Sequence, residues 1–312
     1  MLYSIGIDIG GMSIKVGIVD ENGKILKECR RVTAPTSNEC ILGIAEQINV
    51  LLSSTNLTID KIKGIGVGCP GSVSPDVGIV DFLPNLGWHK VPLVKELKKY
   101  FDLPISIAND ASVAALAEVK YGVAKDYNDC IMFTLGTGVG GGIILNKQIY
   151  DGANGKGGEL GHIILDLNGE PCTCGRRGCV ETFVSATALI RQTKTAMLKD
   201  ESSSMWKYSG GLDGVDGKTA FECAKKGDKT ALDVVENYSR FLAESIMSML
   251  NIFRPQAFIL GGGISMQGQY LIDKVVSYCE KFDYGYKGSP KTEILCAKLG
   301  NDAGIIGASA LV

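Results

Sequence analysis

The sequence lacks the features that mark secreted, membrane-spanning and nucleic-acid-binding proteins. Its 32 Lys and Arg are balanced by 34 Asp and Glu, with no long run of either sign, which does not favour nucleic acid or an anionic membrane as a partner. No apolar stretch approaches the roughly 18 residues of a membrane span. The first residues, MLYSIGIDIGG, lack the basic region and cleavage site of a signal peptide. We therefore expect a cytoplasmic protein.

Two common motifs of phosphoryl transfer are also missing. There is no Gly-x-x-x-x-Gly-Lys-Ser/Thr loop and no catalytic loop of the protein-kinase type. The run Gly136-x-Gly138-x-x-Gly141 matches the dinucleotide fingerprint by letter, but that fingerprint requires a helix after its last glycine. The chain instead continues with the strand-like residues Ile143–Leu145, so the pattern argues against a Rossmann enzyme.

At 312 residues, the chain is long enough for two α/β domains. Alternating apolar residues predict strands at Tyr3–Ile9, Ser13–Val19, Ile62–Val67, Ile105–Ala108, Cys130–Leu135 and Ala257–Leu260. Helical spacing predicts helices after a capping Ser37 and over Val91–Tyr100, Ala111–Tyr121 and Ala231–Phe253, with others after Gln267 and at the C-terminus.

The order strand, glycine turn, strand and polar turn occurs twice, at residues 5–24 and again at residues 130–148. We interpret this recurrence as an internal structural repeat. Two similar halves facing each other would form a cleft. The predicted domains are residues 1–108, joined by a C-terminal helix at 300–312, and the larger segment 109–299.

Both glycine turns are candidate phosphate sites, because backbone N–H groups there can approach an anion without Cβ atoms in the way. The first turn holds Gly10 and Gly11, and Asp8 before it could bind magnesium. A tight hairpin with an incidental aspartate is an equal alternative. The second turn offers Thr137 and Gly138. A further glycine run, Gly261–Gly263, lies between a predicted strand and a helix, where a nucleotide can approach closely.

A group of potential metal ligands follows the second turn. His162, Cys172, Cys174 and Cys179 supply four groups of the type that tetrahedral zinc prefers. A disulfide or buried free thiols are the alternatives, and a cytoplasmic, glycine-rich context disfavours both. Four protein ligands leave no open position, so the predicted zinc is structural. It would shape a loop that carries Glu159 and Glu181, which could then grip sugar hydroxyls rather than remain solvated surface acids.

Asn109 and Asp110 come at the end of a predicted strand and the start of a helix. Ligands bind at this position in α/β sheets. Helix capping explains the same two residue types. Their occurrence beside two phosphate-type turns and a metal-bound loop favours a catalytic role.

Taken together, these motifs closely resemble the ROK family, which includes sugar kinases and repressors. The residues that carry the resemblance are Asp8–Gly11, Gly68–Gly71, Pro84–Trp88, Asn109-Asp110, Leu135–Gly138, Glu159–His162, Cys172–Glu181 and Gly261–Gly263.

The resemblance implies an actin-like ATPase fold of the ribonuclease H-like type, with two α/β domains, an interdomain cleft and a homodimer. It also implies ATP-dependent phosphorylation of a hexose or hexose derivative, glucose or N-acetylmannosamine, at the 6-hydroxyl, with ATP and magnesium as cofactors. Asp110 is implied as the general base. The other implied sugar contacts are Gly71, Asn109, Glu159, His162 and Glu181. The implied ATP contacts are Asp8, Gly10, Gly11, Thr137, Gly138, Gly262 and Gly263.

One residue departs from the family pattern, because family kinases usually have Thr where this chain has Met12. A hydroxyl contact to phosphate is lost, and we expect a weaker grip on the nucleotide. A β-glucoside kinase, another hexose kinase and a catalytically weak sugar sensor stay open as alternatives. A repressor is expected to carry a winged helix before the first hairpin, which here starts at Tyr3.

Overall fold

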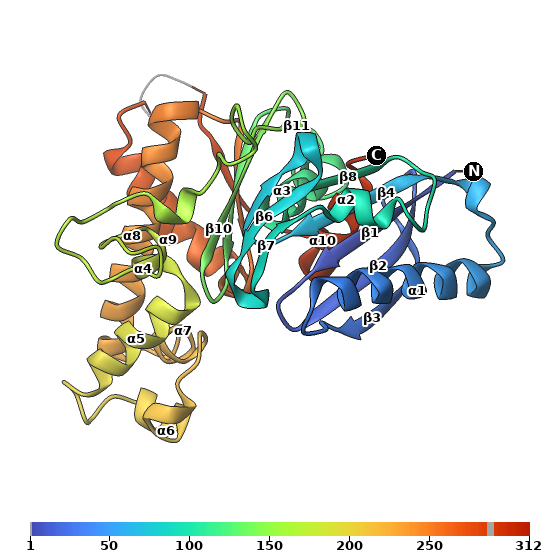
Figure 1. Cartoon of the computed structure of the whole chain (residues 1–312). Coiled ribbons are helices and arrows are strands. Elements are labelled where there is room, and N and C mark those ends of the chain that lie inside the picture. Colours follow the sequence, from blue (N-terminus) through green and yellow to red (C-terminus); the bar gives the residue numbers. More distant parts are fainter. Residues whose placement is uncertain (1, 286–289) are drawn as a thin grey trace. The chain divides into compact units, whose positions relative to one another are not determined.

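The computed structural model describes residues 2–285 and 290–312, which form a mixed α/β architecture with three sheets (Figure 1). In the first sheet, the neighbouring strands are β3 (Ile25–Val32), β2 (Ser13–Asp20), β1 (Tyr3–Ile9), β4 (Ile62–Cys69) and β8 (Ile105–Asn109). The first three strands are antiparallel, whereas β4 and β8 run parallel to β1. This combination is an antiparallel meander extended by parallel strands.

The second sheet repeats this order of strands. Its neighbours are β11 (Gln148–Ile149), β10 (Val139–Leu145), β9 (Cys130–Leu135), β12 (Ala257–Gly261) and β13 (Glu293–Cys296). The meander strands β11, β10 and β9 are again followed in the sheet by two strands from later in the chain, β12 and β13. These two strands are parallel to each other. The internal repeat predicted from the sequence is therefore confirmed.

Helix α1 (Ser37–Thr55) packs on one face of the first sheet. Its buried residues Ile41, Ile44 and Ile48 follow helical spacing and join the core of β1. The predicted cap was wrong by one residue. Thr36, rather than Ser37, is the N-cap of the helix and forms a reciprocal capping box with Glu39.

Helix α10 (Ala303–Ser309) packs on the opposite face of the first sheet. A Cβ atom on Gly6 of β1 would lie 1.9 Å from the carbonyl oxygen of Ile305, and one on Gly66 of β4 would lie 1.8 Å from that of Ala308. Only glycine fits at either position. These two glycines therefore let the helix backbone lie directly on the strands.

The fully buried carboxylate of Glu118 fixes the segment that leads into α10. Glu118 lies on α3 (Asp110–Lys120) and accepts the backbone N–H groups of Lys298 at 2.8 Å and Leu299 at 2.7 Å through one oxygen. Its other oxygen accepts the N–H of Val123 at 2.9 Å. The C-terminal segment is thus tied to α3 as well as to the strands.

The third sheet was not predicted. Its strands are β5 (Ser72–Ser74), β6 (Ile79–Leu83) and β7 (Trp88–Val91). The helix predicted over Val91–Tyr100 is shorter, because Val91 pairs with Val80 in this sheet. Helix α2 spans only Leu93–Leu97.

The chain divides into two compact units. Unit 1 contains Met1–Cys130, Gly142–Gly158 and Lys298–Val312, and unit 2 contains Ile131–Gly141 and Glu159–Ala297. The helices of unit 2 are α4 (Glu181–Val184), α5 (Ala186–Met197), α6 (Met205–Ser209), α7 (Thr219–Ala224), α8 (Lys229–Phe253) and α9 (Gln269–Phe282). The domain boundaries at residues 108 and 299 stay a prediction.

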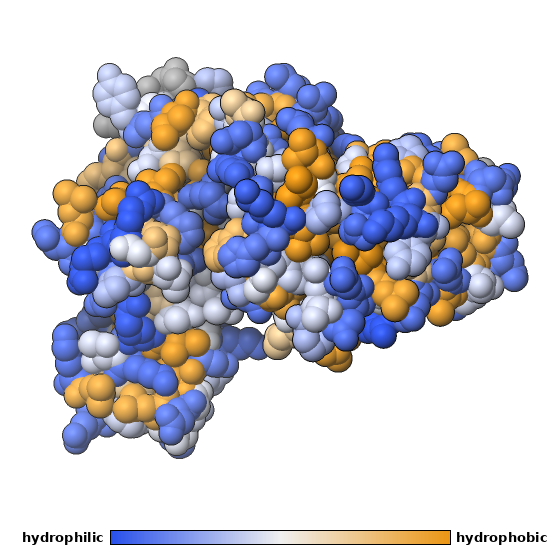
Figure 2. Space-filling view, in the orientation of Figure 1, coloured by the Kyte–Doolittle hydropathy of each residue, from blue (hydrophilic) through white to orange (hydrophobic). Residues whose placement is uncertain are grey.

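Hydrophilic residues cover most of the face in Figure 2, and hydrophobic residues lie among them in small groups. Among the helices of residues 2–285 and 290–312, none combines the length and apolar character needed to cross a bilayer.

Candidate functional site

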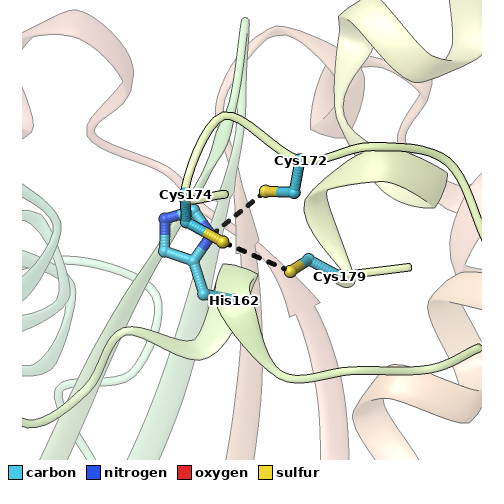
Figure 3. A group of neighbouring side chains, drawn as sticks. All are labelled: His162, Cys172, Cys174 and Cys179. Carbon is cyan, nitrogen blue, oxygen red and sulfur yellow. Dashed lines mark hydrogen bonds between the residues drawn. The ribbon is translucent and has the colours of Figure 1, made fainter. Parts of the chain in front are cut away.

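The four predicted metal ligands come together in unit 2 (Figure 3). The ligand atoms of His162, Cys172, Cys174 and Cys179 all lie within 4.8 Å of one another, and the three cysteines are free thiols. Cys172 Sγ lies 3.5 Å from His162 Nδ1, and Cys174 Sγ lies 3.7 Å from Cys179 Sγ. The sequence spacing correctly predicted this cluster.

Two glycines shape the loop that brings the thiols together. Gly175 has φ +88° and lets its N–H bond the carbonyl of Cys172 at 3.0 Å in a tight turn. Gly178 has φ +66°, and a Cβ atom there would lie 1.5 Å from the carbonyl oxygen of Asp166. A residue other than glycine at position 178 would push the loop apart.

The donor set and spacing of this cluster fit a tetrahedral ion. Metal–sulfur distances of about 2.3 Å and metal–nitrogen distances of about 2.0–2.1 Å give tetrahedral edges of about 3.8 Å and about 3.6 Å. The observed separations of 3.7 Å and 3.5 Å match these edges. The backbone N–H of Arg176 lowers the pKa of Cys174 to about 6, whereas burial and the two neighbouring thiols raise the pKa of Cys179 to about 12. The thiolate form that binds metal is therefore favoured at Cys174.

Glu181, two residues after the last of these cysteines, links the metal loop to the second glycine turn. One carboxylate oxygen accepts the N–H of Val139 at 3.0 Å. The other accepts the hydroxyl of Thr173 at 3.4 Å, beside Cys172. A Cβ atom on Gly138 would lie 2.4 Å from the first oxygen, so the turn fits around this carboxylate.

The second turn also lies beside Gly262, which follows β12. Gly262 has φ +79°, and a Cβ atom there would lie 2.5 Å from the carbonyl oxygen of Leu135, the last residue of β9. The structure thus brings Thr137, Gly138 and Gly262 to the same end of the second sheet. Gly263 opens the short 3-10 helix Gly263–Gln267, with open space where a side chain would be.

Glu159, the other predicted carboxylate of unit 2, is exposed. It directly precedes the 3-10 turn Leu160–His162, and its carbonyl accepts the N–H of His162 at 3.1 Å. Glu159 is therefore joined through this short turn to a metal-ligand candidate.

The first glycine turn is held from β3 in unit 1. Thr33, the residue after β3, donates its hydroxyl to the carbonyl of Gly10 at 2.7 Å and its N–H to the carbonyl of Met12 at 3.1 Å. The N–H of Gly10 bonds Ser13 at 3.0 Å. Within the described residues, the N–H groups of Gly11 and Met12 donate to no protein group. The Met12 side chain is 84% exposed.

Asp8 lies near the carboxyl end of β1, just before this turn. Its carboxylate is paired with Lys15 Nζ at 3.3 Å. A Cβ atom on Gly304 would lie 2.6 Å from the carboxyl carbon, so glycine in α10 makes room for this group. The carboxylate is thus placed where a cation bound to phosphate could meet it.

Asn109 and Asp110 lie at the end of the neighbouring strand β8. Asn109 caps α3 by accepting the N–H of Ala111 at 2.9 Å, and its amide donates to the carbonyl of Gly71 at 3.2 Å. Asp110 is the first residue of α3. Burial raises the pKa of the Cys69 thiol, and the charges of Asp110 and Asp8 raise it further.

The strand register places Asp8 opposite Gly68 and Asn109 opposite Cys69, so Asp8, Asn109 and Asp110 all lie near the end of β4. Gly71 has φ +79°, and a Cβ atom there would lie 2.4 Å from the carbonyl oxygen of Phe82. Only glycine fits this close approach.

Some residues of interest were not predicted from the sequence. Thr33, Ala186 and Thr187 help to hold the two glycine turns, but these contacts join residues up to 50 positions apart, and no local sequence signal marks them. A cavity of about 610 Å³ in unit 2 was also missed. It is lined by Glu170, Phe183, Arg191, Gln192, Thr195, Ala196, Lys199, Asp200, Thr230, Asp233, Val234, Asn237 and Phe241, none of which is a predicted site residue.

Comparison with known proteins decides the family. Residues 4–312 match the sequence profile of the ROK family. The chain belongs to the ROK family. It is 36% identical to a glucokinase of Thermotoga maritima, covering 100% of this chain and 97% of the relative. It is also 30% identical to a xylose repressor of Bacillus spizizenii, covering 99% of this chain and 77% of the repressor.

Among solved structures, a ROK family glucokinase from Streptomyces griseus in complex with glucose and AMPPNP superposes with a TM-score of 0.82. The two chains are 33% identical, and the match covers 99% of each. As a ROK protein with this likeness and two repeated sheets, the chain has the actin-like ATPase fold that the resemblance implied.

Proposed function

We propose that this ROK protein is an ATP-dependent kinase that transfers the γ-phosphate of ATP to a hydroxyl of a hexose or hexose derivative. The observation that carries the proposal is the position of Asp110 at the start of α3, next to Asn109 and its bond to Gly71. Full-length similarity to a glucokinase, and structural likeness to a glucokinase that binds glucose and AMPPNP, support the same activity.

In this proposal Asp110 is the general base. The sugar oxygen attacks the γ-phosphorus, its proton passes to the Asp110 carboxylate, and the bond to the β-phosphate oxygen breaks to release ADP. Because the transition state of phosphoryl transfer is loose, positioning and charge stabilisation supply most of the catalysis. The proposed sugar contacts are Gly71, Asn109, Glu159, His162 and Glu181.

The nucleotide is proposed to bind through backbone donors. Beside Gly10, the first turn offers the N–H groups of Gly11 and Met12. Within the described residues, neither N–H donates a hydrogen bond to a protein group. The second turn contributes Thr137 and Gly138, and Gly262 with Gly263 line the nucleotide site. Magnesium would be held by Asp8 together with the phosphates, and when bound it neutralises phosphate charge.

We propose zinc as the metal of the cysteine and histidine cluster. Three thiols and one imidazole with tetrahedral edges are the ligands that structural zinc prefers. The ion would hold the loop that carries Glu181. His162 is the ligand we expect to contact both zinc and sugar, through different ring atoms. A cytoplasmic homodimer completes the proposal.

Glucose and N-acetylmannosamine are the proposed acceptors, at the 6-hydroxyl, and a β-glucoside or another hexose is the alternative. The test is ATP-dependent ADP release against a panel of these sugars, with metal-replete protein. Asp110→Asn is expected to fold and keep its metal but to lose roughly 10²- to 10⁴-fold in kcat. Full turnover by this variant would exclude Asp110 as the base.

A sugar sensor is the second candidate, favoured by two observations. A xylose repressor is 30% identical over 99% of the chain, and Met12 replaces the usual hydroxyl residue. Tight sugar binding without ADP release would support the sensor. Met12→Thr would then be the variant with which to seek kinase activity.

A further inference from the structure

The segment 181–187, which comprises α4 and the start of α5, forms hydrogen bonds to the second glycine turn. Ala186 donates its N–H to the carbonyl of Gly136 at 2.8 Å. Thr187 donates its hydroxyl to the carbonyl of Thr137 at 2.8 Å. With the bond between Glu181 and the N–H after Gly138, successive peptide groups of the turn are held from one side.

These bonds set the direction of the turn's own donors. In a trans peptide the C=O of one residue and the N–H of the next point in opposite directions, and no peptide bond in the described chain is cis. Anchoring the carbonyls of Gly136 and Thr137 therefore points the N–H groups of Thr137 and Gly138 away from the segment. Within the described residues, neither N–H donates to a protein group. Two converging N–H groups of this kind form an anion-binding nest.

Thr187 has no comparable task in its own helix. The cap of α5 is Ser185, whose side chain accepts the N–H of Ala188 at 3.0 Å. The Thr187 side chain is exposed and lies outside the core. Its hydroxyl therefore contributes to the shape of the turn rather than to the formation of the helix.

We propose that Thr187 is a positioning residue for the nucleotide, which fixes the second turn so that its amides meet a phosphate. The inference rests on the proposed kinase function and names a residue that holds the phosphate turn without touching phosphate. Because Cys179 and Glu181 precede it in one short stretch, the same segment connects the metal loop to the nucleotide turn.

Thr187→Val removes the hydroxyl while keeping the shape of the side chain. One net hydrogen bond corresponds to a loss of roughly threefold to tenfold in affinity. We expect the Kd of AMPPNP, measured by calorimetry, and the KM for ATP to rise by this factor. The KM for the sugar and the metal content are expected to stay unchanged. Thr187→Ser keeps a hydroxyl and is expected to restore most of the nucleotide affinity.

The matched control is Thr195→Val. Thr195 lies on the same helix, and its exposed hydroxyl donates to the carbonyl of Arg191 at 3.0 Å, its one hydrogen bond within the described residues. This variant is expected to bind AMPPNP as the unmodified protein does. Equal Kd values for Thr187→Val and Thr195→Val would overturn the inference, as would an unmodified protein that binds no AMPPNP. Binding of AMPPNP without sugar-dependent ADP release would instead contradict the kinase proposal and leave the Thr187 comparison intact.

Discussion

The two glycine turns occupy the same place in repeated sheets, yet they are supported differently. In unit 1 the support comes from the neighbouring strand, because the eight-residue β3 ends at Val32, which pairs with Ser13 and puts Thr33 beside the turn. In the second sheet the corresponding strand β11 has two residues, which pair with Ile144 and Leu145 at the far end of β10.

A strand of this length does not reach the turn, so it has no counterpart of Thr33. The segment 181–187 holds the second turn instead, from 42 to 50 residues away in sequence. A repeat can therefore conserve the position of a binding turn while changing what holds it. The first turn depends on one strand, whereas the second depends on a segment that directly follows the cluster of His162 and the three cysteines.

Removing a metal ligand should have the largest effect on the second turn. Cys179→Ser is expected to abolish metal binding, because it removes one of the four ligands. Structural zinc sites contribute on the order of 10 kcal/mol to folding, so the loop should also lose stability. The second turn then loses its support, and we expect roughly tenfold or greater loss of AMPPNP affinity together with a lower melting temperature. Metal analysis, calorimetry and thermal unfolding measure the three effects.

Cys296→Ser is the control for this experiment. Cys296 is a half-buried thiol of unit 2, and its Sγ contacts the carbonyl of Ser265 at 3.3 Å rather than the metal cluster. It should retain the metal. A Cys179→Ser protein with unchanged metal content would contradict the assigned ligand set.

A single methyl group tests the second turn alone. In Gly138→Ala the new Cβ would lie 2.4 Å from the Glu181 carboxylate and displace it from the N–H of Val139. Loss of a hydrogen bond to a charged group costs about 1.5–3 kcal/mol, so AMPPNP affinity should fall roughly tenfold to hundredfold. Gly136→Ala, in the same turn, adds a methyl group into open space and should change little. Similar affinities for the two variants would refute the role given to Glu181.

The smallest expected effect concerns the first turn. Thr33→Val removes the hydroxyl bond to Gly10 but keeps the backbone bond to Met12. We expect roughly threefold to tenfold weaker AMPPNP binding with no change in metal content. Thr55→Val is the control, since the Thr55 hydroxyl bonds only within α1. A change in metal content on Thr33→Val would argue against independent support of the two turns.

The sequence allowed most strands, the repeat and the metal cluster to be predicted, because each has a local signal. Cys130–Leu135 is apolar except for Thr134 and was predicted with its correct bounds. The ligand cysteines lie within eight residues of each other. The third sheet was not predicted, because its strands have only three to five residues, too few for a periodic pattern.

The contacts that hold the two glycine turns were not predicted for another reason. Thr33, Glu181 and Thr187 act through contacts to carbonyl and N–H groups of distant residues, and backbone groups carry no sequence information. Glu181 was predicted as a sugar contact because its motif suggested it. Its bond to Val139 could be found only once the chain was folded.

The close contact of α10 with Gly6 and Gly66 bears on how the protein is made. The ribosome releases the first strands long before residues 298–312, which belong to the same compact unit. Until then, one face of the first sheet lacks its covering helix, and the carboxylate of Glu118 lacks two of its N–H partners. Unit 1 can therefore be completed only after residues 298–312 have left the ribosome, and a nascent chain must keep this face from aggregating until then.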